Sequence, residues 1–115
     1  MKILRFEDIV SWQKSRYLTR EIYMLFRSNR DFGFRDQIQR ACVSIMNNIA
    51  EGFERKGNKE FKNFLFIAKG SCAEVRSMLY LAFDLNYISQ SSLNNELIPM
   101  TEEISRLLSG LIKTL

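Results

Sequence analysis

The chain of 115 residues contains no histidine and few side chains arranged for catalysis. Without histidine, neither a nucleophile paired with an imidazole nor the Glu-x-x-His pattern of di-iron bundles can form. Glu51 and Glu54 are near neighbours, but their spacing does not put them on a shared inward face. Glu51 precedes Arg55 by four residues, the spacing of an ordinary surface ion pair on a helix. Gly52 and Gly57 match neither phosphate-binding glycine motif. We therefore predict no enzymatic activity and no cofactor.

Cys42 and Cys72 are the only cysteines. Both fall in apolar helical contexts, which favours two buried free thiols over a disulfide. Two thiols without a histidine do not complete a zinc site. We predict no metal.

Lysine and arginine are the side chains whose chemistry suggests a function. Residues 1–76 contain 15 Lys and Arg against 9 Asp and Glu, residues 77–115 contain 2 against 4, and the net charge is +4. The candidate nucleic-acid contacts are Arg16, Arg20, Arg27, Arg35, Arg40, Arg55, Lys56, Lys59, Lys62 and Lys69. Such side chains suit phosphate groups. They equally suit a solvated helix face, and no motif of a defined nucleic-acid-binding module decides between the two.

Three residues of the same region are interpreted as structural. Asn48 borders an apolar stripe, and its amide needs hydrogen-bond partners. We expect a bond that sets helix register or ties the following turn, with ligand contact as the alternative. Glu51 is assigned to the surface pair with Arg55. Gly52 falls on the core-facing line, where close approach of a neighbouring helix would explain a glycine.

The periodicity of apolar residues predicts four helices, at about 7–27, 33–55, 59–86 and 91–115. The expected core stripe of the first helix is Ile9, Trp12, Ser15, Leu18, Ile22, Leu25 and Phe26. That of the second helix is Phe34, Ile38, Ala41, Cys42, Ile45, Ile49 and Gly52. Short links between such helices predict an all-α fold, an antiparallel up-and-down four-helix bundle in one domain over residues 1–115.

Residues at the links give the expected helix ends. Gly57 is predicted to end the second helix as its C-cap, and Asn58 to begin the third as its N-cap. Ser89 is the predicted N-cap of the fourth helix. Pro99 lies inside that helix, which is therefore either kinked at Pro99 or regular only from there.

The third predicted helix has a second face that is not simply polar. At 100° per residue, this face presents Phe66, Gly70, Ala73, Ser77 and Tyr80. An exposed helix face in a monomer is normally richer in charge. We predict self-association through this face, with an ordinary mixed surface as the alternative.

The sequence predicts a cytoplasmic protein without a membrane partner. Its uninterrupted apolar runs are far shorter than a membrane span. Arg5, Glu7 and Asp8 precede any apolar segment of the kind found in signal peptides.

Several segments resemble a known family across nearly the whole chain. They are Phe6-Glu7-Asp8-Ile9, Trp12-Gln13-Lys14, Asp36-Gln37-Ile38-Gln39-Arg40-Ala41, Ser44-Ile45, Asn48-Ile49-Ala50-Glu51-Gly52-Phe53, Arg55, Phe61, Phe64-Leu65, Ile67-Ala68-Lys69-Gly70-Ser71 and Glu74. This set is similar to the four-helix bundle proteins encoded in intervening sequences of bacterial large-subunit ribosomal RNA genes. It also resembles the related accessory variability determinant of diversity-generating retroelements. Two features depart from the family pattern, namely Ser28-Asn29-Arg30-Asp31 in place of a link with proline and glutamate, and Pro99.

The resemblance implies a bundle that assembles into a homopentamer and has no enzymatic activity. The retroelement members of the group are basic, associate with a reverse transcriptase and contact nucleic acid. The sequence thus leads to a non-enzymatic oligomeric bundle that binds RNA or DNA through Lys and Arg. The alternative is a protein-interaction scaffold or accessory subunit for a nucleic-acid enzyme.

Overall fold

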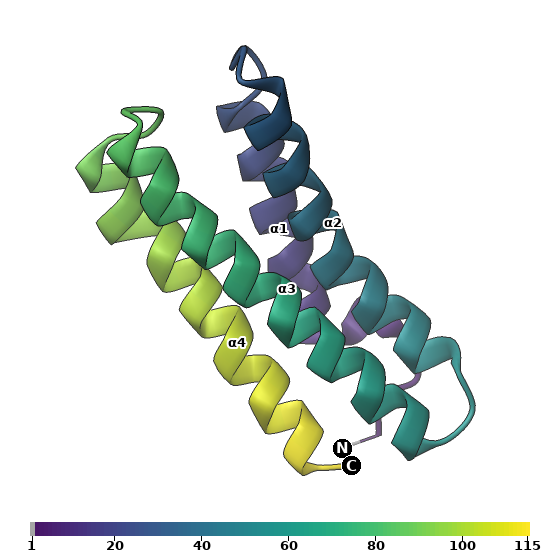
Figure 1. The fold of residues 1–115 in the computed structure, drawn as a ribbon. Coiled ribbons are helices and arrows are strands. Elements are labelled where there is room, and N and C mark those ends of the chain that lie inside the picture. The colour runs from purple at the N-terminus through teal and green to yellow at the C-terminus, as the bar shows by residue number, and fades with distance from the viewer. Residues whose placement is uncertain (1) are drawn as a thin grey trace.

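The computed structural model describes residues 2–115, which form an antiparallel four-helix bundle, as predicted (Figure 1). A short 3₁₀ turn, Phe6–Asp8, leads into the first helix. The four main helices are α1 (Val10–Leu25), α2 (Phe32–Glu54), α3 (Asn58–Asp84) and α4 (Ile98–Lys113). The bundle measures 43 × 24 × 19 Å, and both ends of the chain lie at the same end of it (Figure 1).

The helices pack in a ring in which each one touches its two neighbours. Contacts join α1 to α2, α2 to α3, α3 to α4 and α4 to α1. Helices α1 and α3 are therefore diagonal to each other, so their outer faces look in opposite directions. No helix among residues 2–115 is long and apolar enough to cross a membrane.

The core stripe of α2 is buried at all seven predicted positions. The stripe of α1 is confirmed except at two residues. Leu25 is 42% exposed and Trp12 is half-buried. Adjacent residues are separated by about 100° around a helix, so Leu25 turns outward where Phe26 points into the core. Trp12 packs edge-on against Phe6 at 5.2 Å between ring centroids, on the flank of the core.

The capping residues of the turn between α2 and α3 differ from the prediction, by two residues for the C-cap of α2 and by one for the N-cap of α3. Arg55 ends α2 as its C-cap, Gly57 is the N-cap of α3, and Asn58 is already the first helical residue. Because its backbone is helical, the Asn58 side chain makes no capping bond. Gly57 has φ 98°, a conformation that glycine adopts without the steric cost of a Cβ.

Asp31 joins the two links at the far end of the bundle. One carboxylate oxygen accepts a hydrogen bond from the Phe34 backbone N–H at 3.3 Å and caps α2. The other accepts from the Tyr87 hydroxyl at 2.7 Å. This bond raises the pKa of Tyr87 above its ordinary value.

Pro99 stands in the first turn of α4, in agreement with the second of the two predicted alternatives. A π-helical turn over Ser92–Leu97 precedes it, in which the Ile98 N–H donates to Leu93 O, five residues back. A wider turn accommodates a proline that offers no N–H to the carbonyl one turn earlier. Upstream, Ser89 Oγ accepts from the Ser92 backbone N–H at 3.0 Å, which is the predicted cap.

Candidate nucleic-acid interface

Most of the predicted basic contacts are free of carboxylate partners within the described chain. Only Arg35 and Arg55 of the ten form ion pairs, with Asp36 at 3.2 Å and with Glu51 at 2.8 Å. Both guanidinium groups also lie over aromatic rings, Arg35 over Phe32 at 4.8 Å and Arg55 over Phe64 at 5.1 Å. These two arginines are committed to local contacts. The remaining eight are available to a partner.

The first group of unpaired cations, which we call the α3 lysines, comprises Lys56, Lys59, Lys62 and Lys69. Lys56 and Lys59 are exposed at the turn before α3 and in its first residues, whereas Lys62 and Lys69 are half-buried along it. Arg76 continues the seven-residue spacing of Lys62 and Lys69 and lies 3.9 Å from Glu102 of α4. The lysines therefore follow the side of α3 that faces α4.

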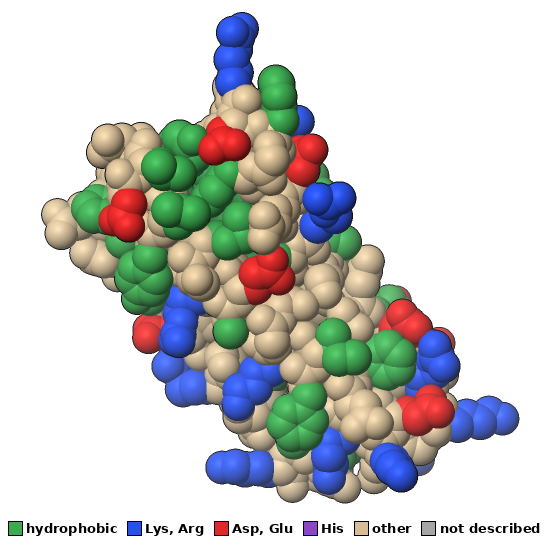
Figure 2. Space-filling model, in the orientation of Figure 1, with side chains coloured by type: hydrophobic (Ala, Val, Ile, Leu, Met, Phe, Trp, Pro, Cys, Tyr) green, Lys and Arg blue, Asp and Glu red, His purple; other side chains and the backbone are tan. Residues whose placement is uncertain are grey.

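Figure 2 shows Lys and Arg side chains gathered over the lower part of this face, around the α2–α3 turn and the adjoining ends of α3 and α4. A larger group of hydrophobic side chains covers its upper part. Hydrophobic side chains also lie between the basic ones in the lower part, and some charged side chains lie in the upper part, so the two kinds of surface overlap.

The second group consists of Arg16, Arg20 and Arg27, all exposed on or just after α1. The Arg16 guanidinium lies 5.7 Å from the centroid of the Trp12 ring. Because α1 is diagonal to α3, this group and the α3 lysines occupy opposite sides of the bundle. Arg40 is exposed on α2. The ten predicted residues therefore do not form one continuous surface.

All five residues of the predicted self-association face of α3 are exposed: Phe66, Gly70, Ala73, Ser77 and Tyr80. Phe66 is 53% exposed and Tyr80 is 49% exposed. Ile67 and Leu81, which the prediction omitted, add exposed apolar area on the same helix. Ile67 and Leu81 directly follow Phe66 and Tyr80 in the sequence, so a prediction that allowed a wider apolar face would have included them.

Asn48 takes part in a chain of hydrogen bonds that crosses from α2 to α3. Its Nδ2 donates to Ser44 O at 2.8 Å and to Ser44 Oγ at 3.0 Å. Ser44 Oγ in turn lies 2.8 Å from Ser71 Oγ. The sequence showed that Asn48 needed partners but not which ones, because the pairing of Ser44 with Ser71 depends on the register of the two helices.

Gly52 packs tightly against α3. A Cβ built on Gly52 would stand 2.5 Å from Phe64 Cβ and 3.2 Å from Phe61 Cδ1. Glu51, on the exposed side, pairs only with Arg55 among its described neighbours. Of the three residues interpreted as structural, Asn48 and Gly52 lie at the contact between α2 and α3, and Glu51 lies on the outer surface of α2.

Cys42 and Cys72 are buried free thiols, as predicted. Burial raises the pKa of both, that of Cys72 to about 11. Cys72 Sγ donates to Thr101 O at 3.2 Å. Within residues 2–115, no group of three His, Cys, Asp or Glu side chains could hold a metal ion.

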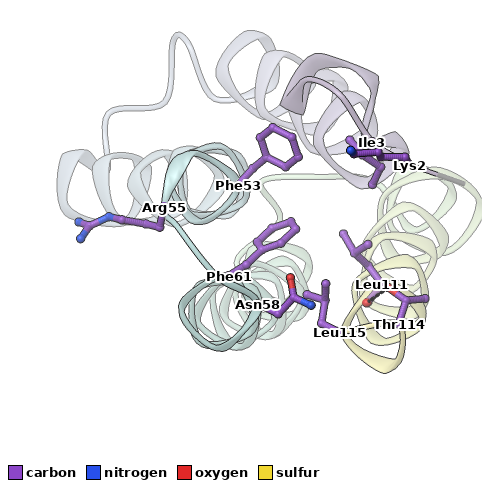
Figure 3. A pocket seen from close by; sticks show the side chains of 10 residues that line it. Lys2, Ile3, Phe53, Arg55, Asn58, Phe61, Leu111, Thr114 and Leu115 are labelled. Carbon is purple, nitrogen blue, oxygen red and sulfur yellow. Dashed lines mark hydrogen bonds between the residues drawn. The ribbon is translucent and has the colours of Figure 1, made fainter.

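An open pocket of about 500 Å³ lies at the end of the bundle near the chain termini (Figure 3). Phe53 and Phe61 face each other on one side of it, and Leu111 and Leu115 approach from α4, while Arg55 points away (Figure 3). Polar residues, among them Lys2, Asn58 and Thr114, share the lining with the apolar ones, and none of the lining side chains is a carboxylate.

Comparison with known proteins places this geometry in a family. A model of the 23S rRNA-intervening sequence proteins matches residues 7–110. The crystal structure of a protein of unknown function from the S23 ribosomal protein family of Bacteroides thetaiotaomicron superimposes with a TM-score of 0.82 at 28% identity, covering 90% of this chain and 96% of that one. No curated protein matches the sequence. Since the family match spans nearly all of the four helices, the chain belongs to the 23S rRNA-intervening sequence protein family.

Proposed function

We propose that this protein is a non-enzymatic oligomeric bundle that binds RNA or DNA through its unpaired lysines and arginines. The observation that carries the proposal is the freedom of these cations. Eight of the ten basic residues picked out in the sequence make no ion pair among residues 2–115, although the chain has 13 Asp and Glu.

The α3 lysines are the central part of the proposed contact. A lysine without a carboxylate neighbour keeps its full attraction for a phosphate and releases counterions when it binds one. Lys56 and Lys59 reach solvent at the turn, and Lys62 and Lys69 extend the same charge along α3. Contacts of this kind position a nucleic acid without reading its bases.

Self-association through the α3 face is the second part of the proposal. Phe66 and Tyr80, with the small residues between them, offer an apolar surface of the kind that another copy can cover. The family resemblance favours a homopentamer. Repeating the α3 lysines in each subunit raises the effective affinity for a long polyanion beyond that of one subunit.

The experiment compares two triple variants that lose the same charge. The first variant changes Lys59, Lys62 and Lys69 to Gln. The control variant changes Lys2, Arg106 and Lys113 to Gln. Gel shift with structured RNA and with duplex DNA at low salt is expected to show binding by the wild type and the control, and weaker binding by the first variant. Equal binding by both variants, or no binding by an intact wild-type oligomer, contradicts the proposal.

The exposed apolar face also suits a protein partner, which is the competing function. In that case the protein acts as a scaffold or accessory subunit for a nucleic-acid enzyme such as a reverse transcriptase. Co-purification with nuclease treatment separates the two. A partner protein that stays bound after nuclease digestion favours the scaffold. Co-purifying nucleic acid, with any proteins that are released when it is digested, favours direct nucleic-acid binding by this protein.

A further inference from the structure

The outer face of α1 combines arginines with exposed aromatic rings. We define the α1 stripe as Gln13, Arg16, Tyr17, Arg20, Tyr23 and Arg27. Tyr17 is 53% exposed and Tyr23 is 43% exposed. Large aromatic side chains normally bury most of their area, so two half-exposed tyrosines among three arginines are unusual for a purely solvated face.

Positive charge on the α1 stripe is uncompensated within residues 2–115. None of its three arginines makes an ion pair. The only acidic residue of α1 is Glu21, seven residues after Lys14 and hence on the same side of the helix. Lys14 pairs with Glu103 of α4 at 3.4 Å. Glu21 also follows Tyr17 by four residues, so it lies at the edge of the α1 stripe that is nearer α4, about 100° around the helix from Arg20.

The surface of the α1 stripe is also hollowed. A shallow hollow of about 210 Å³ opens between Gln13, Arg16, Tyr17 and Arg20. Arg16 is held beside it by its stacking on Trp12 at 5.7 Å. Arg16 and Arg27 are about 16 Å apart along the helix axis, at a rise of about 1.5 Å per residue. Tyr17 and Tyr23 are six residues and hence about 120° apart around the helix, so cationic and aromatic groups alternate along a broad stripe on α1.

We infer that the α1 stripe binds single-stranded nucleic acid, with bases stacked on Tyr17 and Tyr23 and phosphates on Arg16, Arg20 and Arg27. Unpaired bases expose the ring faces that aromatic side chains stack on, whereas a duplex hides them. The inference rests on the proposed function and adds to it a second contact, opposite the α3 lysines, that distinguishes single strands from duplexes. Stacking and phosphate contact are common to RNA and DNA, so both single strands are ligands.

The tyrosines provide the decisive variants. Binding is measured by fluorescence anisotropy with a labelled single strand of about twelve nucleotides, within the site sizes of known single-strand binders, and with a duplex of the same sequence. Tyr17→Ala and Tyr23→Ala are each expected to weaken single-strand binding about fivefold or more. Duplex binding is expected to stay unchanged. Tyr17→Phe and Tyr23→Phe, which keep the ring, are expected to bind like the wild type.

The arginines and the single tryptophan provide independent readouts. Arg20→Gln and Arg27→Gln are each expected to reduce the salt dependence of single-strand binding by about 0.7 in the log–log slope. Trp12 is the only tryptophan. Because it lies under Arg16, its emission is expected to change when a single strand binds.

The outcomes separate this inference from the proposed function. Unchanged single-strand binding by both Tyr→Ala variants, with circular dichroism showing intact folds, overturns the inference. If binding then still depends on Lys59, Lys62 and Lys69, the proposed function stands. If the wild-type oligomer binds neither single strands nor duplexes at low salt, both are overturned. A preference for single-stranded RNA over single-stranded DNA, or the reverse, shows which of the two is the ligand.

Discussion

Gly52 shows how one residue sets the distance between two helices. Its absent Cβ leaves room for Phe64 Cβ, an atom attached directly to the α3 backbone. No side-chain rotation can move that atom away. The close packing of α2 on α3, and with it the placement of the α3 lysines relative to the turn, depends on this glycine.

Gly52→Ala is therefore expected to destabilise the protein, by about 1–3 kcal/mol, because the two helices must separate to admit one carbon. Gly110→Ala is the control, since a Cβ at Gly110 meets nothing within 4 Å. That change is expected to stabilise α4 by up to about 1 kcal/mol. Urea unfolding measures both. A Gly52→Ala protein as stable as the wild type would contradict the packing described for the hairpin.

Tyr87 gives a pH-dependent contribution to stability. Its hydrogen bond to Asp31 favours the protonated phenol in the folded state, which is why its pKa is raised. The contribution is fully present below pH of about 10, the ordinary tyrosine pKa. It is lost as pH rises through the raised pKa, when the phenolate meets the carboxylate.

Thermal unfolding of the wild type and Tyr87→Phe tests this sign. The melting temperature of Tyr87→Phe is expected to be lower at pH 8, and the difference is expected to shrink as pH rises above about 10. A difference that grows with pH would mean that Tyr87 is not held as a donor to Asp31.

At the scale of helices, the α2–α3 seam is held by Ser44 and Ser71 as well as by close packing. Ser71→Ala removes the hydroxyl that lies 2.8 Å from Ser44 Oγ. It is expected to lower the free energy of unfolding by about 1 kcal/mol relative to Ser109→Ala, a change at a partly exposed serine of α4 outside this contact. Chemical denaturation of both variants gives the difference directly. Equal stabilities would show that the seam does not depend on this bond.

Helix positions and the core of α2 were predictable because the apolar period is regular from Phe34 to Gly52. The N-cap of α3 was misplaced by one residue because Gly57 and Asn58 are both good capping residues, and only the backbone shows which one caps. Asp31 was read only as part of a link. Its place three residues before Phe34 is the spacing of an N-cap, but its bond to Tyr87 depends on how two distant links meet.

The candidate interface was predictable residue by residue but not as a surface. Counting charges found Arg35 and Arg55 together with the α3 lysines. Only the structure separates the arginines committed to Asp36 and Glu51 from the cations left free. The diagonal placement of α1 and α3, which divides the basic residues between two sides, follows from the packing of the whole bundle.

At the scale of the whole molecule, the exposed apolar face of α3 predicts assembly. Phe66→Glu is expected to lower the mass measured by light scattering at micromolar concentration, because a buried carboxylate in an apolar interface is costly. Phe32→Glu, a substitution of another exposed phenylalanine at the start of α2, is expected to leave the mass unchanged. A wild-type protein that is monomeric at this concentration would refute self-association.

The most direct test of the central claim is the salt dependence of nucleic-acid binding by the wild-type protein. Binding driven by unpaired lysines and arginines predicts that the logarithm of the association constant falls linearly with the logarithm of the salt concentration. The slope is expected to be about −0.7 per phosphate for single strands and about −0.9 for duplexes. It should become shallower when Lys59, Lys62 and Lys69 are changed to Gln. Affinity that does not change with salt, or no binding at low salt by an intact oligomer, would contradict the account.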